Sequence, residues 1–189
     1  MRKVSLIICL LVAATMVISG CSEGTDMERL EGKVTELDNK YPNADFMLHV
    51  HPDYPIVLAT TDYLEIPGSD DRPPDIFVTY AQNKSDLDAG QISAVEEQLG
   101  DDLLYGPYEG EAVAKLNYRP IAYAFSDATD IWEFNGIEIE YTVNEEASVL
   151  FAGIELQQGG YFIEFYLKDG FDEEDAKSFI QFLLTDLNL

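Results

Sequence analysis

The chain has 189 residues and is strongly acidic, with 36 Asp and Glu against 11 Lys and Arg and a formal net charge of −25 at pH 7. Its 47% of apolar residues is typical of a globular protein rather than a disordered one, and its length suits one domain with its own core. The charge excludes nucleic acid as an expected partner, because DNA and RNA binding depends on Lys and Arg, and it also repels anionic lipid headgroups.

The first 21 residues have the pattern of a secretory signal that ends at a cysteine. Arg2 and Lys3 precede an apolar run at residues 4–18, which is shorter than the roughly 18–20 residues that a transmembrane helix needs. The motif Ile18-Ser19-Gly20-Cys21 resembles the lipobox of bacterial lipoproteins, in which the cysteine receives a diacylglyceryl group and becomes the first residue of the mature protein. An ordinary secretory signal and a retained membrane anchor are the two alternatives.

The lipobox resemblance implies that residues 1–20 are a signal peptide and that Cys21 is lipidated, with palmitate as an acyl group. Two acyl chains hold a protein stably at a bilayer, whereas a single chain binds only marginally. Arg2, Lys3 and Cys9 would leave with the signal, so the mature chain would have nine basic residues, a net charge of −27 and no second cysteine. That count excludes an intrachain disulfide, a cysteine metal site and a cysteine nucleophile. The expected location is the extracytoplasmic face of the cell membrane.

The first part of the domain, which is expected to span residues 27–189, is predicted to be irregular and rich in proline. Residues 21–26 are expected to be the lipidated cysteine and a short polar tether. A helix is predicted at residues 27–39, where apolar residues recur at helical spacing. Prolines punctuate the region 52–74, whose role the sequence does not indicate. The other predicted segments are strands at 45–51, 56–59 and 76–81, an exposed loop at 69–74, a helix at 91–99 and a loop at 101–110.

The second part has the pattern of an antiparallel meander followed by a helix. Ile137, Ile139 and Tyr141 alternate with glutamates, as in a half-buried strand, and Asn-Gly and Gly-Gly pairs supply turns. Asp172 is a good N-cap for a final helix with one apolar stripe. We therefore expect an α+β fold of one domain, in which an antiparallel β-meander packs against an amphipathic C-terminal helix. The strands are predicted at 112–117, 120–125, 136–143, 147–156 and 160–167, and the stripe is Ala176, Phe179, Ile180, Leu183, Leu184 and Leu187.

Residues 130–187 carry a second resemblance. The strand after the Asn135-Gly136 turn, the strand that begins Gly160-Tyr161 and the acid-capped final helix are similar to an uncharacterised C-terminal domain of Gram-positive lipoproteins. The residues concerned belong to turns and to the core. The resemblance implies an envelope protein and assigns no functional residue.

Two groups of residues are candidates for a metal ion. Residues 85–96 have the spacing of an EF-hand calcium loop that ends at Glu96, although Asp86 and Asp88 stand one position away from the ligand positions. His49 and His51 would share one face of a strand, which is one way to begin a zinc or copper site. An acidic turn before a helix, and histidines that are exposed or at the edge of the core, are the plainer interpretations. The acids are spread along the whole chain, which favours adaptation to habitat over cation binding.

Tyrosine side chains are the remaining candidates for a binding surface. The favoured interpretation is that the tyrosines pack between the sheet and a helix. If any are exposed, we expect them to be Tyr105 and Tyr108, which lie in a Gly-Pro loop. The sequence has none of the common hydrolase motifs, and we expect neither catalysis nor a cofactor. The leading prediction is a non-catalytic binding or interaction module of the cell envelope, with the membrane and an envelope protein as partners. The alternatives are a divalent-cation-binding lipoprotein and a small envelope hydrolase.

Overall fold

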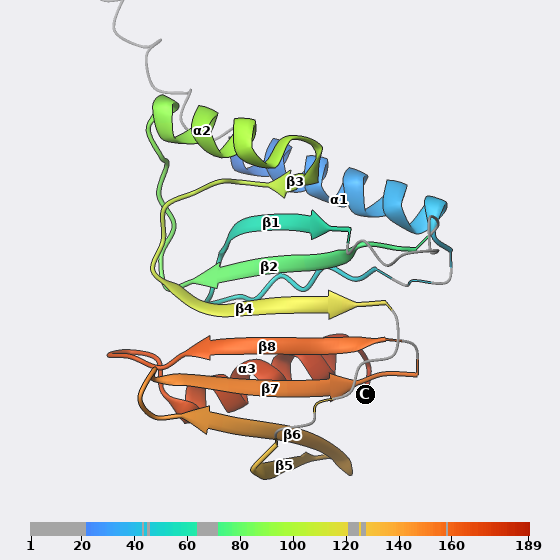
Figure 1. Ribbon diagram of the computed structural model, residues 1–189, viewed down its shortest axis with the longest axis vertical. Helices are drawn as coiled ribbons and strands as arrows, with labels where there is room; N and C mark the ends of the chain where they lie inside the picture. The colour runs from blue at the N-terminus through green and yellow to red at the C-terminus, as the bar shows by residue number, and fades with distance from the viewer. Residues whose placement is uncertain are drawn as a thin grey trace, which may run out of the picture.

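The structure is a computed structural model that describes residues 22–42, 44, 46–63, 72–120, 125, 128–157 and 159–189, with side chains described from Met27 onward. In this part of the chain, an eight-stranded antiparallel sheet has the strand order β3-β1-β2-β4-β8-β7-β6-β5 (Figure 1). Three α-helices and one short 3₁₀ helix accompany it. The fold is therefore a single α+β domain, as predicted, and β-structure dominates it.

The N-terminal half of the domain supplies the three strands at one edge of the sheet. Its elements are α1 (Ser22–Lys40), β1 (Ile56–Asp62), β2 (Asp75–Ala81), α2 (Ala89–Leu99), the 3₁₀ helix η1 (Gly100–Asp102) and β3 (Leu103–Tyr105). Helix α1 starts at Ser22, so the segment 22–26 is helical where a tether is predicted. The predicted loop at 101–110 contains η1 and β3. Of the predicted exposed loop 69–74, residues 69–71 lie outside the described residues, and Pro74 is buried.

Residues 46–51 are irregular instead of forming the predicted strand. The Asp38 side chain accepts the Phe46 N–H at 2.9 Å, and the Tyr80 hydroxyl donates to the backbone oxygen of His49 at 2.6 Å. Side chains thus satisfy backbone groups of this segment that a neighbouring strand would satisfy in a sheet. The sequence alternates like a strand here, but these contacts with α1 and β2 determine its course.

The C-terminal half supplies the other five strands of the sheet and the last helix. Its elements are β4 (Ala112–Arg119), β5 (Asp130–Phe134), β6 (Ile137–Asn144), β7 (Val149–Glu155), β8 (Gly160–Tyr166) and α3 (Glu173–Asp186). Strands β5 to β8 form a meander, and β8 then pairs with β4, from Ala114↔Phe165 to Arg119↔Gly160. The meander is thus confirmed, with β5 as a strand that the sequence did not predict. The predicted strand 120–125 falls largely outside the described residues.

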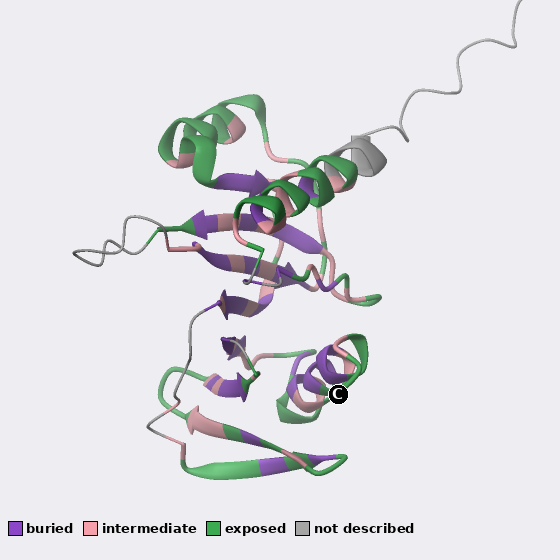
Figure 2. Ribbon diagram, turned by 90° about the vertical axis from the view of Figure 1, so that its right-hand side faces the viewer, coloured by how far each residue is buried: buried purple, intermediate pink, exposed green. Residues whose placement is uncertain are grey.

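Helices α1 and α3 lie on the same face of the sheet (Figures 1 and 2). The core lies between them and that face, where Tyr80, Phe165 and Phe179 are fully buried. Asp172 caps α3 as predicted, because its side chain accepts the N–H groups of Glu174 and Asp175 in a capping box. The buried residues of α3 are Ala176, Phe179, Ile180, Leu183 and Leu184.

Candidate functional site

The lipobox and Cys21 lie outside the described residues, so the lipidation stays a prediction. The first described residue, Ser22, follows Cys21 directly and begins α1. Helix α1 belongs to the folded domain, because Leu30 and Leu37 are part of the core. A group attached to Cys21 would therefore be one residue away from a helix that is docked on the domain. Among the described helices, none combines the length and the apolar character needed to cross a bilayer.

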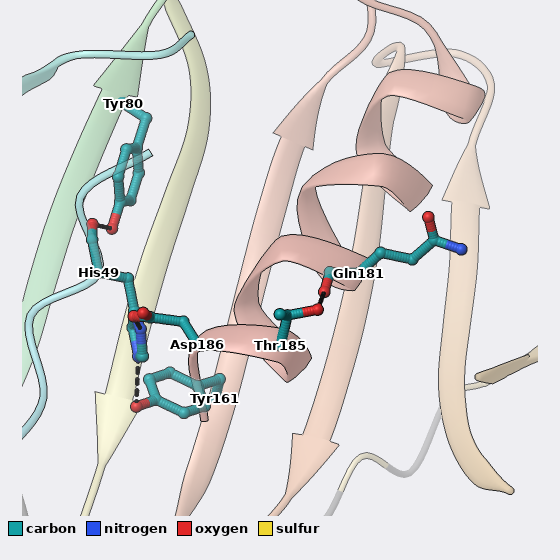
Figure 3. A network of polar contacts seen from close by, with 6 residues as sticks. All are labelled: His49, Tyr80, Tyr161, Gln181, Thr185 and Asp186. Atoms are coloured by element: carbon teal, nitrogen blue, oxygen red, sulfur yellow. Dashed lines mark hydrogen bonds and ion pairs between the residues drawn. The ribbon is translucent and has the colours of Figure 1, made fainter. Parts of the chain in front are cut away.

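A polar network is centred on His49, in the irregular segment between α1 and β1 (Figure 3). The Nδ1 atom of His49 lies 2.6 Å from Asp186 Oδ2 in the last turn of α3. The Nε2 atom lies 2.8 Å from the hydroxyl of Tyr161 on β8. An ionised carboxylate only accepts hydrogen bonds, so Nδ1–H donates to Asp186 and Nε2 accepts from the Tyr161 hydroxyl.

The surroundings of His49 give it a structural role. Its side chain is 1% exposed, and this burial lowers its pKa below the ordinary value of 6.5, against the opposing effect of Asp186. The imidazole is therefore neutral at pH 7, and both of its nitrogens are engaged. His49 has no solvent access and no free nitrogen with which to activate a substrate. It joins four parts of the fold and is buried, where the sequence predicts an exposed or core-edge histidine.

His51 lies two residues further on and contacts a different group of side chains. Its ring stacks on Phe179, with the centroids 4.8 Å apart and the planes 4° apart, and Tyr54 and Phe182 lie against it. Partial burial lowers the pKa of His51, and the nearby Asp53 carboxylate acts in the opposite direction. The two histidines therefore do not converge on one site. No group of three His, Cys, Asp or Glu in the described part of the chain is placed to hold a metal ion.

The acids of the predicted calcium loop serve the start of α2. Asp88 is the N-cap, and its Oδ1 accepts the N–H groups of Gly90 at 2.9 Å and Gln91 at 3.0 Å. The Gln91 side chain in turn accepts the Asp88 N–H at 3.1 Å, which completes a capping box. Asp86 and Glu96 are exposed. This segment is therefore an acidic turn that leads into a helix.

Tyr105 and Tyr108 pack inward, as the favoured interpretation of the tyrosines predicts, so they are not an exposed binding surface. Tyr105 is 1% exposed in β3, and Tyr108 is half-buried against the core. The loop is drawn inward because Tyr108 N–H donates to Val57 O at 2.9 Å, and because Gly106, at φ 82°, approaches that carbonyl where a side chain would clash. Lys84 covers both rings: it donates to the Tyr105 hydroxyl at 2.7 Å, and its Nζ lies 3.9 Å from the centroid of Tyr108.

A pocket of about 550 Å³ lies beside these tyrosines. It is lined by Asn83, Lys84, Ser85, Glu109, Gly110 and Glu111. Two of its charged groups already have partners, since Lys84 contacts the tyrosines and Glu111 forms an ion pair with Lys168 at 3.2 Å. The pocket therefore offers few groups that are free to select a ligand.

The face of the sheet opposite α1 and α3 is here named the open face. Cross-strand register places Phe77, Asn117 and Phe162 in one row on it, and Lys115, Glu164 and Phe151 in the next. Phe77, Phe151 and Phe162 are half-buried. Phe151 and Phe162 stack with centroids 5.7 Å apart, and Phe125 lies 6.1 Å from Phe162. The open face is therefore an aromatic band that keeps partial contact with solvent.

Charged and polar groups border this aromatic band. The Lys115 Nζ lies 5.1 Å from the centroid of Phe77. Asp75, 1% exposed, lies within 3.2 Å of Arg72 Nη2 and 3.3 Å of Arg119 Nε, the latter at an angle unsuited to a hydrogen bond. Burial raises the pKa of Asp75, and the two guanidinium groups oppose that rise. This cluster around the buried Asp75 carboxylate links β2 to the end of β4.

Strand β5 forms the edge of the sheet farthest from β3 (Figure 1). Trp132 and Phe134 point to the helix-covered face and are each 7% exposed, and Trp132 stacks on Tyr141 with centroids 4.1 Å apart. Ile131 points to the other face and is 51% exposed. Glu133 lies directly opposite Glu138 on β6, and both are exposed.

One pattern in the sequence indicates the open face, whereas β5 has only a weak strand pattern. Strand β8 has aromatic residues on both of its faces, Tyr161 and Phe165 on one and Phe162 and Tyr166 on the other. A strand that is apolar on both faces is covered on both or leaves apolar surface to solvent. Strand β5 alternates over only five residues, two of which are acidic, which is a weak strand pattern.

Comparison with known proteins gives no relative on which to base a function. No protein-family model, no curated protein and no solved structure matches the chain.

Proposed function

We propose that this chain is a lipid-anchored protein on the extracytoplasmic face of the cell membrane that acts as a non-catalytic binding module. The anchor is supported by the Ile18-Ser19-Gly20-Cys21 motif and by the basic and apolar residues before it. The binding role is carried by the open face, where Phe77, Phe151 and Phe162 stay half-exposed while α1 and α3 fill the other face. Aromatic surface of this kind gives a partner a large contact area at a small entropic cost.

The two alternatives have less support. For a cation-binding lipoprotein, Asp88, one of the two acids that stand beside the expected ligand positions, is engaged as a helix cap. For a hydrolase, His49 is buried with both nitrogens engaged, and His51 is packed between aromatic rings. Binding through the open face is the role that depends on side chains that stay partly exposed in the fold.

The anchor is tested by exporting the full chain in a bacterial host and measuring the mass of the mature protein. We expect a diacylglyceryl group on Cys21, retention in the membrane fraction, and loss of both in Cys21→Ala. An unmodified mature protein that is released into the medium would contradict the anchor and leave the binding role to be tested separately.

The binding role is tested with a matched pair of variants in cells. Phe77→Ser removes an aromatic ring from the open face, whereas Val50→Ser alters an exposed apolar residue outside the sheet. We expect an envelope protein that crosslinks to the wild type to be lost with Phe77→Ser and retained with Val50→Ser, by quantitative mass spectrometry. Thermal melting checks that both variants are folded. Equal crosslinking by both variants would contradict binding through the open face.

A further inference from the structure

We propose that the outer edge of β5 is a docking site for an extended segment of a basic protein partner, which adds to the sheet as a ninth strand. The proposal rests on the proposed role as a binding module and names the place and the chemistry of the contact. Three features carry it: the pairing of β5, the anchoring of β5 in the core, and the side chains beside it.

The two edges of the sheet differ in how they are protected. Strand β3 has three residues, α1 lies against it, and Lys33 of α1 donates to the backbone oxygen of Leu103. Strand β5 has five residues, and in the described part of the chain it pairs with β6 alone. A free edge presents backbone N–H and C=O groups that an extended peptide can pair with. On β5 the Ile131 N–H already donates to the Asp130 Oδ1 at 2.9 Å, so an added strand would displace that contact. Five residues span about 17 Å at roughly 3.4 Å per residue, which is the length of an ordinary strand.

The β5 edge is held in place before any partner arrives. Trp132 and Phe134 are each 7% exposed on the helix-covered face. Asn135 at φ 52° and Gly136 at φ 84° form the tight turn into β6, and five residue pairs join the two strands. A preorganised edge loses little conformational entropy when it binds. More of the free energy of the main-chain hydrogen bonds to an added strand therefore contributes to affinity.

The side chains beside the edge define the partner. On the open side of β5, Ile131 is 51% exposed and Glu133 stands two residues further on. Glu133 faces Glu138, and Ile131 faces Glu140 on β6. Like charges directly opposite each other are unfavourable, and a cation placed beside Glu133 relieves that repulsion. An added strand would therefore carry an apolar residue beside Ile131 and, two positions away on the same face, Lys or Arg beside Glu133.

The same charges argue against a second copy of this chain as the occupant. Each copy has a net charge of −25, and β5 itself contributes Asp130 and Glu133. Pairing two β5 edges would bring these carboxylates together without a basic residue from either strand. The charge of the edge thus opposes self-association and favours a basic partner.

The test uses the mature protein, exported by a bacterial host and purified in mild detergent, and three five-residue peptides. The probe is acetyl-Thr-Ile-Thr-Lys-Thr-amide, with Glu in place of Lys in the first control and the same sequence with N-methylated backbone amides in the second. Amide chemical shifts and hydrogen exchange of β5 measure binding by NMR. We expect the Lys peptide alone to shift the Ile131 and Glu133 amides and to slow exchange along β5. Affinity should fall as salt rises from about 0.01 M to about 1 M.

A matched pair of variants separates the β5 edge from the general acidity of the protein. Glu133→Lys and Glu97→Lys change the net charge equally, but Glu97 is exposed on α2, at the other end of the molecule. We expect Glu133→Lys to weaken binding of the Lys peptide by about tenfold and Glu97→Lys to change it by less than about twofold.

Several outcomes would overturn the proposal. Equal binding of the Lys and Glu peptides, equal binding of the N-methylated peptide, shifts outside β5, or no shift at millimolar peptide would each do so. Concentration-dependent dimers with protected β5 amides would identify a second copy as the occupant instead. An unlipidated Cys21 would contradict the anchor without affecting this result. If crosslinking in cells depended on Phe77 but no peptide bound to β5, the role as a binding module would stand and docking at the β5 edge would be rejected.

Discussion

His49 connects residues that are far apart in the sequence, and its position could not be predicted from the sequence. Asp186 and Tyr161 are 137 and 112 residues away from it. The short spacing to His51 was visible and indicated a metal pair, but the two rings turn to different neighbours in the fold. Local spacing places residues on one face of a strand only where a strand forms, and residues 46–51 are not one.

The two histidines are expected to make stability depend on pH. Burial lowers both pKa values, so the unfolded chain takes up protons near pH 6.5 while the folded protein does not. Histidine protonation therefore reduces the free energy of unfolding as pH falls from about 6.5 through the folded-state pKa values, and it has no effect well above that range. The slope is at most about 1.4 kcal/mol per pH unit for each histidine.

Urea unfolding between about pH 5 and pH 8 measures this slope. His49→Gln keeps a hydrogen-bonding side chain and removes one titrating group, so the slope should be smaller than in the wild type. His51→Gln is the companion variant at the less buried site. If neither variant changed the slope, carboxylates rather than histidines would be its source.

The two capped helices allow a comparison at the scale of elements. Asp172 caps α3, which buries five residues, and Asp88 caps α2, which buries none. We expect Asp172→Ala to lower the free energy of unfolding by about 1 kcal/mol, within the usual range of roughly 0.5–2 for a lost cap. Asp88→Ala should fray α2 locally and change global stability by less than about 0.5 kcal/mol.

Urea unfolding and amide exchange separate the two cases. Faster exchange confined to the first turn of α2 would identify local fraying in Asp88→Ala. An equal loss of global stability in both variants would contradict the view that α2 is independent of the core.

The β5–β6 hairpin should be stabilised by relieving its charge repulsion. Glu138→Lys turns the pair with Glu133 from like to opposite charge, and a favourable cross-strand pair contributes about 0.2–1 kcal/mol. We expect a higher urea midpoint at low salt and a gain that shrinks as salt is added. Glu97→Lys is the control for the change in net charge. A gain of the same size in both variants would reflect total charge rather than this pair.

Elements with strong local signals could be predicted, and those that depend on tertiary contacts could not. The Asn135-Gly136 turn, the alternation of β6 and the acid-capped α3 are visible in the sequence and confirmed in the structure. Strand β3 is three residues long, and the burial of Tyr105 depends on Lys84 and Val57, which are distant in sequence. The sheet edge at β5 follows from the order of all eight strands, which no local pattern contains.

At the scale of the whole molecule, the net charge of −25 is expected to make stability depend on salt. Self-repulsion opposes the compact state, and screening reduces it. The thermal midpoint should therefore rise with ionic strength, and calcium, magnesium and zinc should act as plain salt does at equal ionic strength. Saturable stabilisation by one ion that is lost with Glu96→Ala or His51→Ala would instead show a specific site and favour the cation-binding alternative.

The pairing of β4 with β8 has a consequence for the order of events during synthesis of the chain. A chain that emerges N-terminus first completes β4 at Arg119, but the partner of β4 begins at Gly160. One side of β4 therefore has no partner until nearly the whole chain has emerged, and strands with unsatisfied edges are prone to misassociate. The sheet closes last at its centre, so the two halves of the domain become one cooperative unit only when the final strand is in place.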